Sequence, residues 1–217
     1  LAMAGFDLIK DDHSLANQPW SLWNERVEMV CDAVAKANAK TGKKSAYAPS
    51  LNLPADQVHE AAKKAKELGA GALLVLPGIT GFDSMRVIAE DDSIRLPIQA
   101  HPALLGSFVS SPTNGIAHGV ILGTIARLAG ADITIFPNLG GRFSFSREQC
   151  MEIKEKSVAP LNGIKEIWVS PAGGMTLEKI PEMLAMYGND TSLLIGGALS
   201  RGDLATNAKA MVDLVSN

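Results

Sequence analysis

The reactive side chains of this sequence gather most densely in Lys10-Asp11-Asp12-His13, directly after the largely apolar run 6–9. Alternate side chains of an extended segment point to opposite sides, which predicts Lys10 and Asp12 on one side and Asp11 and His13 on the other. Lys10 and Asp12 make a site for a hard cation such as Mg²⁺ only if the lysine carries an acidic group, because an ammonium group repels a cation. Carbamylation by CO₂ would supply that group. The alternative is a salt bridge beside a carboxylate that faces the loop.

Two glycine pairs, Gly173-Gly174 and Gly196-Gly197, follow the last two predicted strands. Residues without side chains let backbone N–H groups close on an anion, and the loops after the last two strands of a barrel are the usual phosphate site. Each pair also suits a tight turn between strand and helix. Two pairs in consecutive loops favour a phosphate site.

A glycine-hinged loop over residues 138–143 contains Gly140-Gly141-Arg142, and His101 ends an earlier predicted strand. We expect the loop to close over a bound phosphate or an enolate oxygen and to exclude water, with a solvent-exposed arginine as the alternative. An imidazole titrates near neutral pH, which makes His101 a candidate acid or base. A structural histidine is the alternative for His101.

Short apolar runs alternate with segments of helical periodicity along the whole sequence, and this alternation predicts an α/β chain. Seven strands are predicted, at residues 6–10, 45–48, 72–76, 98–101, 133–136, 167–170 and 192–195. Seven helices are predicted, at residues 22–40, 56–68, 84–90, 116–128, 147–156, 177–187 and 204–215. Most of the strands are apolar on both faces, as a covered parallel sheet requires. The pattern predicts a single domain over residues 1–217 with the fold of a (β/α)₈ TIM barrel that lacks one unit.

The segment Leu1 to Gly5 is typical of a last helical turn closed by a glycine, and it leads straight into the first predicted strand. We therefore expect one strand and one helix upstream of Leu1. About 30 further residues would give the length of about 250 residues that is typical of such barrels.

Composition excludes several classes of protein. Of 217 residues, 47% are apolar, and 20 basic against 23 acidic side chains leave a formal charge of −3, which predicts no nucleic-acid partner. The sequence contains no apolar stretch of the ~20 residues needed to cross a bilayer, so we expect no membrane partner. Two cysteines, Cys31 and Cys150, fall in helical patterns and are expected to be buried thiols in a reducing, cytoplasmic compartment. The sequence has no P-loop, GxGxxG or zinc-type motif after any strand.

The run from Gly5 to His13 followed by Asn17-Gln18-Pro19 resembles the activation segment of the ribulose bisphosphate carboxylase (RuBisCO) large-chain superfamily. The resemblance extends over essentially the whole chain, from the second to the eighth strand of that family's catalytic barrel. The matching positions are, in chain order, His101, Gly140-Gly141-Arg142, Ala172-Gly173-Gly174 and Gly196-Gly197.

The resemblance implies that Lys10 is the lysine that becomes carbamylated and that Asp12 is a Mg²⁺ ligand, so the implied cofactor is Mg²⁺ with CO₂ as a lysine carbamate. His13 stands where the family usually has a glutamate ligand, and either its ring nitrogen or water takes that place. His101 matches the family's active-site histidine. The two glycine pairs match its first phosphate site.

Other positions depart from true carboxylases. Pro102 stands in place of an arginine that grips a second phosphate, and Ile135 and Ala172 replace a histidine and a serine at the same end of the substrate. Arg142 takes the place of the mobile-loop lysine that steers CO₂ addition. The resemblance is therefore to the RuBisCO-like group, whose members enolise other substrates, and it implies a substrate with one phosphate and no carboxylation.

These observations predict a Mg²⁺-dependent isomerase, enolase or decarboxylase that enolises a ketose or keto-acid monophosphate. Lys10, His101 and Arg142 are the expected catalytic residues. His13 and the segment 136–144 resemble the 5-methylthioribulose-1-phosphate isomerases and the 3-oxo-isoapionate-4-phosphate decarboxylases of the group more closely than its enolases. The alternatives are a Schiff-base aldolase that uses Lys10 and a non-catalytic domain that binds a phosphorylated metabolite or mediates assembly. The family's sites are completed by a neighbouring subunit, which implies a homodimer or larger homo-oligomer and little activity for these 217 residues alone.

Overall fold

The computed structural model describes residues 1–111, 113–141, 143 and 145–215 and has the predicted α/β class. In this part of the chain the strands are β1 (Leu8–Lys10), β2 (Ala46–Ala48), β3 (Leu73–Val75), β4 (Ile98–Ala100), β5 (Ile133–Pro137) and β6 (Trp168–Ala172). The α-helices are α1 (Trp23–Thr41), α2 (Val58–Glu67), α3 (Pro77–Thr80), α4 (Phe82–Glu90), α5 (Ala126–Leu128), α6 (Arg147–Val158), α7 (Ile180–Tyr187) and α8 (Leu204–Val215). Short 3₁₀-helices span Leu105–Phe108 and Leu177–Lys179, and a π-helix spans Val120–Ile125.

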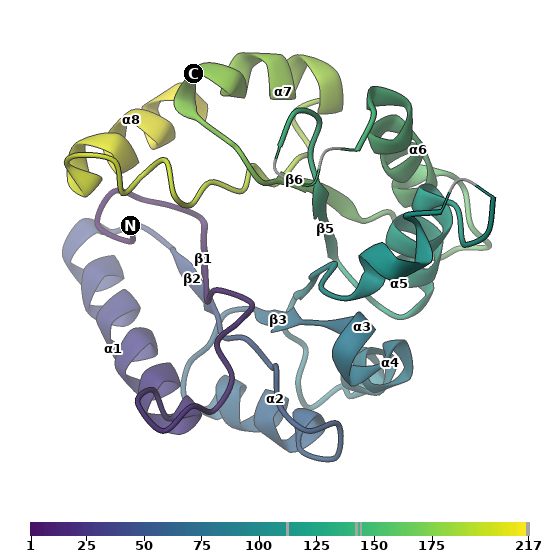
Figure 1. The fold of residues 1–217 in the computed structure, drawn as a ribbon. Helices are drawn as coiled ribbons and strands as arrows, with labels where there is room; N and C mark the ends of the chain where they lie inside the picture. The colour runs from purple at the N-terminus through teal and green to yellow at the C-terminus, as the bar shows by residue number, and fades with distance from the viewer. Residues whose placement is uncertain (112, 142, 144, 216–217) are drawn as a thin grey trace.

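The strands are parallel and follow one another in chain order. β1 pairs with β2, and β3, β4, β5 and β6 form a second sheet in that order. A parallel bridge between Ser50 and Leu74 joins the two sheets, and another between Val169 and Thr191 adds the segment after α7 to β6. Figure 1 shows the strands arranged as a ring with the helices on its outside, and α8 lies beside the N-terminal segment. This order brings the carboxyl ends of the strands to one side of the ring.

The seventh predicted strand, residues 192–195, is absent as a strand. Thr191 makes a single bridge, and Ser192 donates its N–H to the Val169 carbonyl (2.9 Å). The next ladder hydrogen bond to the Ser192 carbonyl would come from residue 171, but Pro171 has no N–H, and the Ser170 hydroxyl donates to that carbonyl instead (2.9 Å). A pattern of apolar residues does not show that a proline of the neighbouring strand faces this segment.

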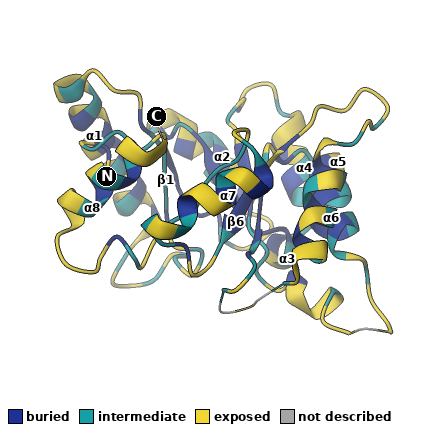
Figure 2. Cartoon of the chain, turned by 90° about the horizontal axis from the view of Figure 1, so that it is seen from above, coloured by how far each residue is buried: buried dark blue, intermediate teal, exposed yellow. Residues whose placement is uncertain are grey.

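The core explains why these segments take their structures. β3 is buried over its whole length, as expected of a parallel strand covered by helices. α1 turns Val27, Cys31 and Val34 inward at helical spacing, and Gly42 ends it at φ +71°. Figure 2 shows the same division, with buried faces turned inward and exposed faces outward. The prediction of buried thiols is confirmed, because Cys31 and Cys150 are both buried and free.

The predicted helix 116–128 differs from a regular α-helix. Residues Val120–Ile125 are π-helical and only Ala126–Leu128 are α-helical. This segment packs tightly on α6, because a Cβ added at Gly119 would lie 2.7 Å from the Glu152 carbonyl oxygen. None of the helices in the described ranges is both long and apolar enough to cross a membrane.

Candidate active site

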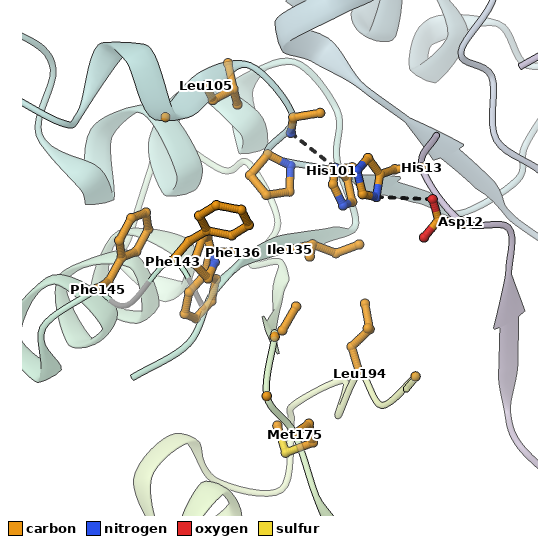
Figure 3. Close-up of a pocket in the computed structure, with 18 of the residues that line it drawn as sticks. Asp12, His13, His101, Leu105, Ile135, Phe136, Phe143, Phe145, Met175 and Leu194 are labelled. Carbon is orange, nitrogen blue, oxygen red and sulfur yellow. Dashed lines mark hydrogen bonds and ion pairs between the residues drawn. The ribbon is translucent and has the colours of Figure 1, made fainter. Parts of the chain in front are cut away.

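A cavity of about 980 Å³ lies at the carboxyl ends of β1, β4, β5 and β6 (Figure 3). Nearly all of the residues predicted to form the site line it. These are Lys10, Asp12, His13, His101, Gly173, Gly174, Gly196 and Gly197. Segments that are up to 187 positions apart in the sequence (Lys10 to Gly197) therefore share one space. The remaining predicted residue, Arg142, lies outside the described residues.

The β1 end of the cavity carries an amine, a carboxylate and an imidazole. The Lys10 amine donates to the Asp11 carbonyl (3.0 Å), and among the described residues no ion pair joins it to Asp12. Asp12 instead accepts from the Ser14 N–H (2.9 Å) and hydroxyl (2.6 Å), and its Oδ1 lies 3.7 Å from His13 Nδ1.

Burial lowers the pKa of Lys10 and outweighs the opposing effects of Asp12 and Asp11. The pKa of Asp12 is also lowered, mainly by the Ser14 hydrogen bonds. A lysine with a lowered pKa is more often neutral, the form that reacts with CO₂ or a carbonyl carbon.

The predicted orientation of His13 is wrong. His13 lines the cavity beside Lys10 and Asp12, and only Asp11 turns away from it. β1 ends at Lys10, and a turn begins at His13, so the two-residue alternation of a strand does not extend that far.

Asp11 lies behind the site in a buried ion pair. Its carboxylate accepts from the Tyr47 hydroxyl (2.7 Å), Arg26 Nε (3.1 Å) and the Ser50 N–H (3.1 Å). Arg26 also donates to the Ala16 carbonyl (2.9 Å) in the loop before α1. The pKa of Tyr47 is raised, first by burial and then by Asp11, so its hydroxyl remains a donor. This network fixes the backbone from which Lys10 and Asp12 project.

His101 lies at the end of β4 as a buried, neutral imidazole. Burial, with smaller contributions from His13 and Lys10, lowers the pKa of His101 to about 3. Its Nδ1 accepts the Ala103 N–H (3.1 Å), which leaves the proton on Nε2. The rings of His101 and His13 stack with centroids 4.2 Å apart, as Figure 3 shows. In this form His101 is suited to donating a hydrogen bond rather than to taking up a proton.

The two glycine pairs differ in what surrounds them. Gly173 and Gly174 have positive φ values, +86° and +67°. Nothing lies within 4 Å of a Cβ built on Gly173, whereas a Cβ at Gly174 would lie 3.3 Å from the Gly141 Cα. Gly196 and Gly197 have no such φ, and nothing lies within 4 Å of a Cβ built on either. Backbone conformation and packing therefore account for the first pair. The open space at the second pair is what an anion bound to backbone N–H groups would fill.

The cavity wall across from the two histidines is apolar. Leu105, Phe143, Phe145 and Met175 line it, and Figure 3 shows them on the side opposite Asp12. Pro102 and Ile135 also line the cavity and carry no charge. A ligand here has a polar end near Lys10 and an apolar end near the phenylalanines.

Sequence analysis missed one cation of the cavity, Arg201, which lines it a few residues after Gly197. The available signal was its position between a glycine pair and the last predicted helix. A single arginine in a loop gives no periodicity or spacing by which it stands out.

The side chains at the β1 end fit a divalent cation only in part. No group of three or more His, Cys, Asp or Glu side chains among the described residues is arranged to hold a metal ion. Asp12 offers an oxygen and His13 a ring nitrogen, and Lys10 becomes a third ligand only when it carries an acidic group. The donor set therefore fits a hard divalent ion with Lys10 modified, and not otherwise.

Comparison with known proteins gives consistent matches. A family model of the ribulose bisphosphate carboxylase large chain, catalytic domain, matches residues 1–210. The chain is 37% identical over 218 residues to a 5-methylthioribulose-1-phosphate isomerase of Rhodospirillum rubrum, covering 100% of this chain and 56% of that protein. It is 33% identical over 198 residues to a 2,3-diketo-5-methylthiopentyl-1-phosphate enolase of Bacillus pumilus, covering 91% and 48%.

A solved structure agrees with these sequence matches. The crystal structure of a Rubisco-like protein from Rhodopseudomonas palustris superposes with a TM-score of 0.88 at 36% identity and covers 99% of this chain. The match spans 57% of that structure's chain. This chain thus spans about half the length of the relatives that it matches.

Proposed function

The chain belongs to the family of ribulose bisphosphate carboxylase large-chain catalytic domains, and from this premise we propose that the full-length protein is a non-carboxylating RuBisCO-like enzyme. Its proposed reaction is enolisation of a ketose or keto-acid monophosphate, the step shared by the isomerase and enolase relatives. The observation that carries the proposal is one cavity that joins the open Gly196-Gly197 backbone to Lys10 and Asp12.

We propose further that the ring is a (β/α)₈ barrel and that residues 1–217 form most of this domain. Six parallel strands in chain order and the added segment at Thr191 support seven of eight barrel positions within the described residues. The first barrel unit and a separate N-terminal domain then belong to the part of the full-length protein outside these residues.

The proposed roles divide along the cavity. The N–H groups of Gly196 and Gly197 bind the phosphate, and His101 Nε2–H donates a hydrogen bond to the oxygen on which negative charge develops. The Lys10 side chain, carrying the acidic group that would also hold the metal, would take up the proton next to the carbonyl. Arg142 remains the cation expected to close over the developing charge.

With an acidic group on Lys10, the side chains of Lys10, Asp12 and His13 would hold Mg²⁺. A bound divalent ion supplies polarisation of a carbonyl oxygen. The chain's own contribution is rigidity, because the buried contacts of Asp11 with Arg26 hold this end of β1 in place.

The apolar wall suggests which substrate end lies opposite the phosphate. The two curated relatives are named for methylthio compounds, and a methylthio group suits the surface formed by Leu105, Phe145 and Met175. We therefore propose a methylthio sugar phosphate as the substrate class.

Turnover by the full-length protein tests the proposed function. We expect conversion of 5-methylthioribulose 1-phosphate or 2,3-diketo-5-methylthiopentyl 1-phosphate, lost with EDTA and lost in Lys10→Ala. Turnover that survives both treatments would remove the mechanism. Ser107→Ala, a substitution at an exposed residue that keeps the cavity charges, is the matched control and should retain activity.

A second experiment separates the rival functions. Borohydride traps a Schiff base, so a substrate adduct on Lys10 would identify an aldolase, and we expect none. A binding module without catalysis would take up the phosphate ester with no requirement for Mg²⁺ or bicarbonate. Calorimetry with and without these two additions measures that requirement.

A further inference from the structure

We propose that Arg201 is a further anion-binding residue, which contacts the phosphate group of the substrate together with the backbone of Gly196 and Gly197. This inference rests on the proposed phosphorylated substrate. It adds a second charged side chain to a site for which the sequence offered the glycine pairs and Arg142.

Arg201 stands at the right end of the cavity. It lines the same space as Gly196, Gly197 and Lys10. Leu199, two residues earlier, belongs to an apolar cluster against which Phe6 packs, so this segment lies beside the start of β1. Figure 1 likewise shows the segment before α8 next to the N-terminal segment. The guanidinium group of Arg201 therefore shares the cavity with the glycine backbone, on a segment that is packed against the start of β1.

The backbone that carries Arg201 is held in place by α8. Asn207 Nδ2 donates to the carbonyls of Leu199 (3.0 Å) and Arg201 (2.8 Å). The side chain of Arg201 is exposed, so it is available to a ligand at the cavity mouth. The anchored backbone reduces the backbone freedom that must be lost when the side chain binds a ligand.

The charge of Arg201 is not neutralised within the described residues. Asp203, the nearest carboxylate in sequence, accepts from the Thr206 N–H (2.9 Å) and hydroxyl, which is a helix cap. No ion pair to Arg201 is found in the described part of the chain, in contrast to Arg86, which pairs with Asp83. An unpaired guanidinium beside free backbone N–H groups binds phosphate by charge-assisted hydrogen bonds.

Calorimetric titration of the full-length protein with inorganic phosphate tests this role. Arg201→Met keeps most of the side-chain length and removes the charge, and it should raise the Kd for phosphate about tenfold or more. Arg201→Lys keeps a point charge and should give an intermediate Kd. Arg86→Met, at an exposed arginine on α4 that does not line the cavity, is the control and should bind as the wild type does.

The outcomes distinguish this inference from the proposed function. Phosphate binding that is equal in wild type and Arg201→Met, with unchanged thermal unfolding, would overturn the role of Arg201 and leave the glycine site intact. If wild type binds no phosphate at millimolar concentration, the anion site fails, and both the inference and the phosphate part of the proposed function fail with it.

Discussion

The open space at Gly196 and Gly197 distinguishes them from most glycines of the chain. Glycine is usually kept for a positive φ, as at Gly173, or for a close contact, as at Gly141, whose added Cβ would lie 2.7 Å from the Gly173 carbonyl. Neither reason applies to Gly196 or Gly197. A bound ligand is the reason that we propose for these two residues without side chains at a cavity wall.

Gly196→Ala tests this explanation. The added methyl group meets nothing in the chain, so the free energy of unfolding should change by about 1 kcal/mol or less. The methyl group occupies space needed by the phosphate, so the KM for the phosphorylated substrate should rise about tenfold or more. Urea unfolding and steady-state kinetics measure the two effects. A large loss of stability with an unchanged KM would show that the glycine serves packing.

Substitutions of the neighbours Asp11 and Asp12 should differ in their effects on stability and turnover. Asp11→Ala leaves the buried Arg26 guanidinium without its carboxylate, which should cost about 3–5 kcal/mol of stability. Asp12→Ala removes a side chain that is 62% exposed, so stability should change by about 1 kcal/mol or less while turnover is lost. Urea unfolding of both variants, with turnover of Asp12→Ala, checks this contrast. Equal destabilisation by the two substitutions would contradict the assignment.

The sequence predicted most residues of the candidate site, but it did not predict the orientation of every side chain. Lys10, Asp12 and the glycine pairs were predictable because each lies at or just after the end of a predicted strand, and all of them line the cavity. The side of His13 was not, since a turn follows β1 directly. The role of Arg201 was not predictable either, because its loop reaches the cavity only once the whole ring of strands has formed.

Helices show how packing changes a correctly predicted element. The periodicity of residues 116–128 predicts a helix, and a helix is present, but six of its residues are π-helical. A helical pattern does not distinguish these forms, because both place apolar residues on the inner face. Close packing of Gly119 and Gly123 on α6 accompanies the π-helix, and this contact lies far beyond a local sequence window.

Gly123→Ala should therefore destabilise the protein. An added Cβ would lie 2.9 Å from the Lys156 Cβ and 3.2 Å from the Ile153 carbonyl, so the helix must move away from α6. We expect a loss of about 1–3 kcal/mol in the free energy of unfolding, measured in urea. Gly196→Ala, which has open space, is the matched control. Equal stability of the two variants would show that the contact is easily relaxed.

The arrangement of the whole molecule was predicted in outline. Alternating strands and helices gave the parallel order that the structure shows for β1 to β6. The last predicted strand, residues 192–195, does not form, because Pro171 offers no N–H to the ladder and the Ser170 hydroxyl donates to the Ser192 carbonyl, a contact made across 22 residues. Patterning thus predicts the order of elements, whereas particular side chains decide where a ladder stops.

The full-length protein is expected to be a homodimer or a larger homo-oligomer. Trp20 is 76% exposed and Met29 is 71% exposed, and both lie in or just before α1. Large exposed apolar side chains of this kind are candidates for coverage by another chain or segment. Light scattering after size-exclusion chromatography should give at least twice the mass of one chain. A monomer at micromolar concentration would contradict this expectation.

Proton exchange tests the central claim most directly. In deuterated water with Mg²⁺ and bicarbonate, the full-length protein should introduce deuterium at the carbon next to the carbonyl of 5-methylthioribulose 1-phosphate. NMR measures this exchange. Lys10→Ala and Asp12→Asn should each abolish this exchange while the protein remains folded. Exchange at the wild-type rate in both variants would contradict the account, because the proton would then move without the residues at the end of β1.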